Sequence, residues 1–123
     1  MKTKNLFIVF LLSATAFTFF NSCGKKCKNN DACNYDEKGG CIDKGKVTFW
    51  NDYISGSHIS VTINGATESM VTEYTSEPNC DATGCANFSL CPGTYNYTAI
   101  SSTGSWGGTV TVTENGCIKV RLN

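Results

Sequence analysis

The chain of 123 residues has one histidine, His58, and no two cysteines in the C-x2-C spacing. It also lacks a G-x-S-x-G motif, and apart from Asp36-Glu37 its acidic residues are scattered singly. Nucleophilic catalysis requires a base positioned beside the nucleophile, and zinc sites are usually marked by closely spaced cysteine pairs. We therefore expect a protein that is not an enzyme, with no catalytic residues, no metal and no cofactor.

Long apolar runs are missing from most of the chain, and the exception lies at its start. Lys2 and Lys4 precede an apolar stretch from Leu6 to Phe20, which is shorter than the roughly 20 residues that span a membrane. A basic start followed by a short apolar stretch is typical of a secretory signal. The sequence thus predicts a signal peptide over residues 1–22 and export by the general secretory route.

The end of this stretch, Phe20-Asn21-Ser22-Cys23, resembles the lipobox of bacterial lipoproteins. Phe20 and Asn21 depart from it, since leucine and a small residue are usual there. The resemblance implies cleavage before Cys23, lipidation of Cys23 and anchoring in the cell envelope through an N-terminal lipid. Gly24 is not the aspartate associated with inner-membrane retention, so the outer membrane is the expected location. The alternative is an ordinary secretory signal followed by a disulfide cysteine.

Charge of one sign is also scarce in the exported part. Residues 23–123 contain eight basic and ten acidic side chains, and this slightly negative balance argues against nucleic acid as a partner. Cysteine, in contrast, is abundant: seven cysteines follow Cys23. This density is typical of an oxidising compartment and predicts disulfides.

Residues 23–45 are polar and rich in turn-forming residues, without apolar periodicity. They contain Cys27-x5-Cys33-Asn34-Tyr35-Asp36, followed by Gly39-Gly40-Cys41. This pattern resembles a short cysteine repeat of exported bacterial surface proteins, although the copy is shorter before its last cysteine and lacks the usual paired aspartates. We expect residues 23–45 to form a lipidated, cysteine-rich tether.

Residues 46–123 show alternating apolar positions of period two, as β-strands do. Asn64-Gly65 is a strong signal for a hairpin turn of type I′. Seven short strands separated by turn signals favour an all-β, seven-stranded antiparallel β-sandwich. The expected strands are Val47–Trp50, His58–Ile63, Ser69–Thr75, Ala86–Leu90, Thr94–Ile100, Gly107–Thr113 and Cys117–Leu122.

The stretch from Gly84 to Tyr95, with Phe88, Leu90 and Pro92-Gly93 between them, narrows the type of sandwich. It is similar to the G-x3-F-x-L-x-P-G-x-Y signature of carboxypeptidase-regulatory-like, or transthyretin-like, domains. The resemblance implies an Ig-like or transthyretin-like Greek key over residues 46–123, with Phe88 and Leu90 in the core. Such domains are usually non-catalytic accessory or binding modules.

Strand direction yields disulfide candidates. If the seven strands alternate up and down, Cys91 and Cys117 lie at one pole of the sandwich and Cys80 and Cys85 at the other. We expect Cys91–Cys117 and Cys80–Cys85, because bonded cysteines have Cα atoms about 4.4–6.8 Å apart. Cys41 is the rival partner of Cys91. Among the remaining cysteines we favour Cys27–Cys41, which leaves an odd thiol that is free or intermolecular.

Aromatic side chains suggest one possible ligand surface. Trp50, Tyr53 and Trp106 lie at strand ends or in Gly/Ser-rich loops, where rings can stack on a sugar, although many aromatic rings of a sandwich face its core. Two hypotheses follow. The chain is a structural or protein-interaction module on the envelope, or it is a module that binds a glycan or other ligand. Clustered rings in one group of loops would favour the second hypothesis.

Overall fold

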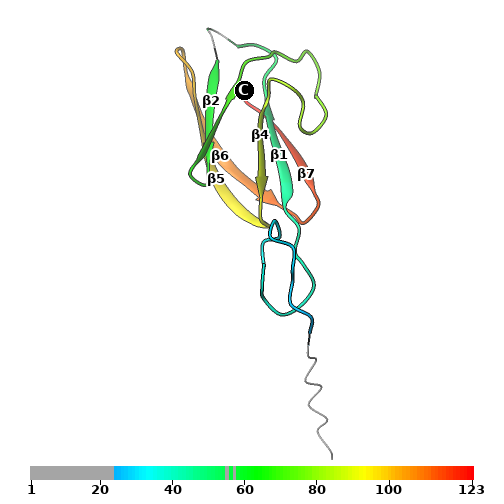
Figure 1. Ribbon diagram of the computed structural model, residues 1–123. Helices are drawn as coiled ribbons and strands as arrows, with labels where there is room; N and C mark the ends of the chain where they lie inside the picture. The colour runs from blue at the N-terminus through cyan, green and yellow to red at the C-terminus, as the bar shows by residue number, and fades with distance from the viewer. Residues whose placement is uncertain (1–23, 55, 57) are drawn as a thin grey trace, which may run out of the picture.

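A computed structural model describes residues 24–54, 56 and 58–123. The predicted signal peptide and the lipidation of Cys23 therefore lie outside the described residues. Within them the structure is all-β, without a helix, and seven strands form two sheets (Figure 1). No helix in this part of the chain is long and apolar enough to cross a membrane.

The smaller sheet has the strand order β4-β1-β7, with β4 over Ala86–Leu90, β1 over Gly45–Trp50 and β7 over Cys117–Arg121. β1 pairs antiparallel with β4 but parallel with β7. The prediction of a purely antiparallel sandwich was therefore wrong. Because successive strands alternate in direction (Figure 1), the first and seventh strands run the same way, and they are neighbours in this sheet.

The larger sheet has the order β3-β2-β5-β6, with all pairs antiparallel. β2 covers Ile59–Ile63, β3 Ala66–Met70, β5 Gly93–Ile100 and β6 Ser105–Val112. Asn64 and Gly65 have φ of 50° and 76°, as a type I′ hairpin requires. This two-residue turn places Ala66 opposite Ile63. The return strand thus begins at Ala66, and the predicted strand Ser69–Thr75 started too late.

The core lies between the two sheets and is centred on Phe49. The Phe49 ring meets Phe88 edge-on at a centroid distance of 5.8 Å and Tyr97 at 4.7 Å. Alternate residues of each strand face inward, as period two requires. Buried side chains include Val47, Phe49, Ile59, Val61, Ile63, Met70, Ala86, Phe88, Leu90, Ala99, Val110, Val112 and Leu122.

The Gly84–Tyr95 motif has a local structural explanation. Phe88 and Leu90 are buried on the inner face of β4. The chain then turns through Pro92 into the other sheet, and the Tyr95 hydroxyl donates a hydrogen bond of 2.7 Å to the carbonyl oxygen of Cys91. Tyr95 thus fixes the corner where the chain passes from one sheet to the other.

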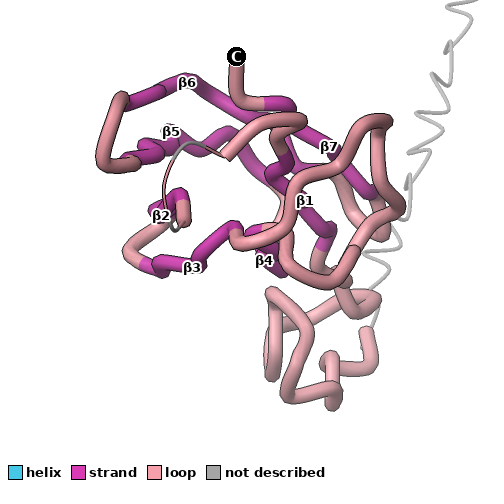
Figure 2. Tube along the Cα trace, turned by 90° about the horizontal axis from the view of Figure 1, so that it is seen from above, coloured by secondary structure: helices cyan, strands magenta, loops and turns pink. Residues whose placement is uncertain are grey.

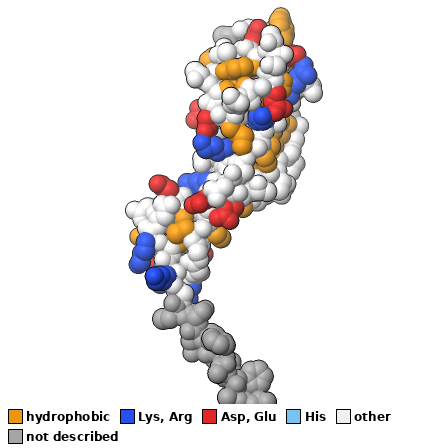
Figure 3. All heavy atoms as spheres, turned by 90° about the vertical axis from the view of Figure 1, so that its right-hand side faces the viewer, with side chains coloured by type: hydrophobic (Ala, Val, Ile, Leu, Met, Phe, Trp, Pro, Cys, Tyr) orange, Lys and Arg blue, Asp and Glu red, His pale blue; other side chains and the backbone are white. Residues whose placement is uncertain are grey.

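A long loop between β3 and β4, residues 71–85, covers the outer face of the smaller sheet. Seen from above, this loop passes outside β1, away from the larger sheet (Figure 2). The Asp81 amide donates to Thr48 Oγ1 at 3.1 Å, and Thr48 has no exposed surface although it points outward from β1. Two ion pairs attach the loop to the sheet, since Asp81 pairs with Lys46 of β1 and Glu77 pairs with Lys119 of β7. Figure 3 shows acidic and basic side chains adjacent on this side of the molecule.

This loop also explains why both predicted sandwich disulfides were wrong. The structure pairs Cys80 with Cys117 and Cys33 with Cys91, at Cα separations of 6.3 and 5.5 Å. Cys91 and Cys117 do lie at the same pole, but β1 separates β4 from β7, and strands two positions apart are about 9–10 Å apart. That separation is too wide for a disulfide. The folded-back loop instead brings Cys80 to Cys117.

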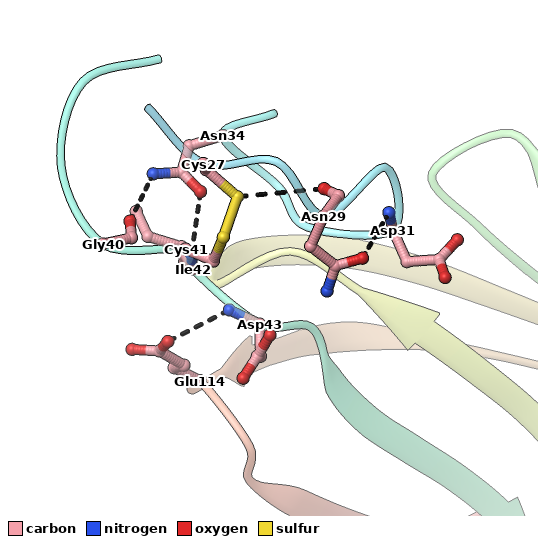
Figure 4. Close-up of a disulfide and its surroundings, with 9 residues drawn as sticks. All are labelled: Cys27, Asn29, Asp31, Asn34, Gly40, Cys41, Ile42, Asp43 and Glu114. Atoms are coloured by element: carbon pink, nitrogen blue, oxygen red, sulfur yellow. Dashed lines mark hydrogen bonds between the residues drawn. A yellow bond between two sulfur atoms is a disulfide. The ribbon is translucent and has the colours of Figure 1, made fainter. Parts of the chain in front are cut away.

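Residues 24–44 form a compact N-terminal module below the sandwich (Figure 1). Cys27 bonds to Cys41, as predicted, with Cα atoms 4.8 Å apart. The Asn34 amide donates to the Gly40 carbonyl oxygen and its Oδ1 accepts from the Ile42 amide, both at 2.7 Å (Figure 4). Asn34 is buried, so one side chain satisfies two backbone groups in the module's interior.

Connections to the end of β4 and to the β6–β7 turn hold this module against the sandwich. Cys33 is bonded to Cys91, which follows β4, and the Asp43 amide donates to Glu114 Oε1 at 3.0 Å in the β6–β7 turn (Figure 4). We call this end of the sandwich the basal pole. Cys85 is the free cysteine of the described residues and is buried. The prediction that the odd thiol is one of the N-terminal cysteines was therefore wrong.

Candidate ligand-binding site

A pocket of about 320 Å³ opens at the opposite end of the sandwich, the distal pole. Its walls come from three places: the segment after β1, the β5–β6 loop, and the end of β7. These segments meet because β1, β5 and β7 run in the same direction, so all three end at this pole. We call the cavity the distal pocket; its lining residues are Asn51, Asp52, Tyr53, Ser101, Thr103, Trp106, Arg121, Leu122 and Asn123.

Two of the three aromatic residues expected at a ligand surface line this pocket. Tyr53 is 69% exposed, and its backbone amide donates to Asn51 Oδ1 at 3.1 Å, which holds the turn that presents the ring. Trp106 is half-buried and packs against the core from β6. The Tyr53 ring is thus an accessible wall of the pocket, and the Trp106 ring is a wall held in place by its packing against the core.

Trp50, the third predicted aromatic residue, does not line the pocket. It is buried, and its Nε1 has no hydrogen-bond partner. The Arg121 guanidinium lies over its ring, 5.5 Å from the centroid. Such a cation–π contact orients the guanidinium, so Trp50 lies behind Arg121, outside the pocket lining.

Arg121 and Asp52 form the charged part of the pocket. Arg121 Nη2 donates to Asp52 Oδ2, and each side chain is a little under half exposed. The amide of the next residue, Leu122, donates to the Trp50 carbonyl oxygen at 3.0 Å. This bond continues the β1–β7 pairing to the pocket floor and fixes Arg121 above Trp50. The pocket therefore contains one positive and one negative group, already paired.

The β5–β6 loop is shaped by its own hydrogen bonds. Ser101 Oγ accepts from the amides of Thr103 and Gly104 at 3.2 and 3.1 Å, and the Ser101 amide donates to the Gly104 carbonyl oxygen at 2.8 Å. These bonds close a tight turn beside Trp106. The hydroxyl of Ser101 is thus used to build the rim of the pocket.

Sequence reasoning found Tyr53 and Trp106 but missed Asn51, Asp52 and Arg121 as pocket residues. The structure pairs Asp52 with Arg121. Counting alternating strands would have placed the ends of the first, fifth and seventh strands at one pole. Within the described residues, no group of three His, Cys, Asp or Glu side chains could hold a metal ion.

Comparison with known proteins found no match: no family model, curated protein or solved structure matches this chain.

Proposed function

We propose that this chain is a non-catalytic, lipid-anchored module of the cell envelope that presents the distal pocket to a ligand. The observation that carries the proposal is that the N-terminal module and the pocket lie at opposite poles of the sandwich. The module directly follows the proposed lipidation site in sequence and lies at the basal pole, while the pocket lies at the distal pole. A membrane anchor at residue 23 would hold the pocket facing away from the lipid surface.

The anchor itself rests on the sequence of residues 1–23. A basic start, an apolar run and Ser22-Cys23 support cleavage and lipidation at Cys23. The several acyl chains of a lipoprotein hold a membrane firmly, whereas a single chain holds it only marginally. The three disulfides support a location outside the cytoplasm, and the outer membrane remains the proposed site.

The family resemblance is kept as part of this proposal. Burial of Phe88 and Leu90 and the hydrogen bond of Tyr95 at the turn agree with the role that a transthyretin-like motif gives these positions. Two packed sheets agree with the same family. Fold similarity does not by itself assign a function, so the ligand-binding role depends on the distal pocket.

The second candidate is a structural or protein-interaction module. The observation that favours it is β6, which forms an outer edge of the larger sheet. Its eight residues, Ser105–Val112, include no ionisable side chain and no proline. Edge strands usually carry charge or proline to prevent pairing with other chains, and an unprotected edge can accept a strand from a partner.

Two measurements test the anchor and the pocket separately. A fatty-acid analogue supplied to cells should label the wild-type chain and leave Cys23→Ala unlabelled; equal labelling would contradict the anchor.

Tagged full-length protein should capture an envelope component that the Tyr53→Ala/Trp106→Ala variant does not retain. Retention by this variant but not by a variant with lysine at Thr109 in β6 would instead favour the protein-interaction candidate.

A further inference from the structure

The charges of the distal pocket bear on what it can bind. Asp52 and Arg121 neutralise each other, and the lining contains no other acidic or basic side chain. A phosphate or carboxylate ligand would have to compete with Asp52 for the guanidinium, and a cationic ligand would have to compete with Arg121. Either ligand would also lie beside the member of the pair that carries the same sign of charge, and like charges repel. The pocket therefore favours a neutral ligand.

The same pair can still form hydrogen bonds with a neutral ligand. A guanidinium carries five N–H donors and a carboxylate has about four acceptor sites. Only one donor and one oxygen are used in the contact between Arg121 Nη2 and Asp52 Oδ2. Hydroxyl groups donate and accept at once, so two neighbouring hydroxyls match a donor and an acceptor presented side by side.

The aromatic residues supply the apolar half of the recognition. Tyr53 presents an accessible ring and Trp106 a half-buried one at the same cavity. A sugar ring has an apolar face of C–H groups and a rim of hydroxyls. Small-molecule sites commonly combine aromatic walls with a few convergent polar groups, and this pocket has that combination.

We infer that the distal pocket binds a neutral saccharide, with Tyr53 and Trp106 against the sugar face and the Asp52–Arg121 pair bonding two of its hydroxyls. This inference rests on the proposed function, because it names the ligand class of the same pocket. Trp50 has a positioning role, since its ring lies under Arg121 and orients the guanidinium toward Asp52.

The test measures binding of full-length protein in detergent to neutral mono- and disaccharides, with the matching uronic acids, amino sugars and sugar phosphates as charged counterparts. Neutral sugars should bind, and their affinity should change little with added salt, because no net charge is being screened. Tyr53→Ala should weaken binding about tenfold or more, and Arg121→Lys, which keeps the charge but loses the planar fork, should weaken it by roughly tenfold.

Tyr35→Ala is the matched control, since Tyr35 is 52% exposed in the N-terminal module, far from the pocket, and its loss should leave the affinity unchanged. Unchanged melting temperatures for Tyr53→Ala and Arg121→Lys would assign the losses to binding. Binding of a charged sugar alone, abolished by Tyr53→Ala, would overturn the neutral-saccharide inference and leave the pocket's function intact. Absence of binding across the panel would also overturn it, and envelope capture unaffected by Tyr53→Ala/Trp106→Ala would remove the proposed function too.

Discussion

At the scale of single residues, Asn34 shows why a sequence motif can require one side chain. Its side-chain nitrogen donates to the Gly40 carbonyl oxygen, and its side-chain oxygen accepts from the Ile42 amide. These two backbone groups lie on either side of Cys41. No other side chain of similar size both donates and accepts at these two positions. The asparagine of the Ala-Cys-Asn-Tyr-Asp core is thus explained by hydrogen bonding.

We predict that Asn34→Asp destabilises the N-terminal module. Aspartate keeps the oxygen that accepts from Ile42 but loses the donor to Gly40. A carboxylate oxygen at this buried position then faces the Gly40 carbonyl oxygen without a hydrogen bond, and an unsatisfied buried polar group costs about 1–3 kcal/mol. Amide hydrogen exchange of residues 27–42 should become faster in the variant. Asn30→Asp, at an exposed position of the same module, is the control. Equal protection in Asn34→Asp and wild type would contradict the role assigned to Asn34.

Cys85 provides a second prediction at this scale. Burial raises the pKa of its thiol above the ordinary value, so the folded protein retains the proton at pH values where the unfolded chain loses it. Stability should therefore fall as the pH rises above about 8.5, the ordinary thiol pKa. Denaturant unfolding at pH 8 and pH 10 checks this, with Cys85→Ala showing the smaller decrease.

The same cysteine should react slowly with alkylating reagents in the folded protein and rapidly after unfolding, because the thiolate is the reactive form. In denaturant without reductant, one thiol should be labelled among the cysteines that the structure describes. Rapid labelling of the native protein would contradict both the burial and the raised pKa.

At the scale of secondary structure elements, the loop between β3 and β4 is the part that the sequence predicted least well. Local patterns located the strands, since alternation and Asn64-Gly65 depend on neighbouring residues. The position of residues 71–85 depends on contacts with Lys46, Thr48 and Lys119, which are distant in sequence. Periodicity contains no information on such contacts, so both predicted sandwich disulfides were wrong although the strand directions were right.

We predict that Cys80→Ala/Cys117→Ala loosens this loop while both sheets persist. The bond joins residues 37 positions apart, and its loss should lower stability by roughly 4 kcal/mol in the chain-entropy treatment. Chymotrypsin should then cut after Tyr74 in this loop faster than in wild type, and far-ultraviolet circular dichroism should be retained. Cys27→Ala/Cys41→Ala, a bond across 14 positions, is the comparison, with a loss of roughly 3 kcal/mol.

Non-reducing peptide mapping checks the pairing directly. Peptides linking Cys80 to Cys117 and Cys33 to Cys91 are expected. A Cys91–Cys117 peptide would mean that β1 does not separate β4 from β7, and the sheet order would have to be revised.

At the scale of the whole molecule, the N-terminal module and the sandwich differ in composition. The sequence indicated the division between tether and sandwich, because cysteine and turn residues dominate one part and alternating apolar residues the other. It indicated two of the pocket's aromatic residues because they lie at strand ends or in Gly/Ser-rich loops. Arg121 and Asp52 could not be recognised as a pair, since 69 positions separate them and only the parallel β1–β7 pairing brings them together.

We predict that Cys33→Ser/Cys91→Ser frees the N-terminal module from the sandwich without unfolding either part. Cys27–Cys41 and the Asn34 bonds remain within the module, and the sandwich keeps its core. Spin labels at exposed Tyr35 and Thr109 should show a narrow distance distribution in wild type and a broad one in the variant. Narrow distributions in both would mean that the contact of Asp43 with Glu114 suffices to fix the module.

The Cys33–Cys91 bond also determines how the molecule would carry a mechanical load. A pull between a ligand in the distal pocket and the proposed lipid at residue 23 would, along the chain alone, enter the sandwich at Gly45. The bond provides a second route, through Cys33 into Cys91 at the end of β4. Since β1 and β4 are hydrogen-bonded neighbours, tension applied to both at the basal pole pulls them in the same direction, and their ladder does not have to resist the whole force. Such a load would therefore have to move β1 and β4 together, and it would not peel β1 away from β4 one hydrogen bond at a time.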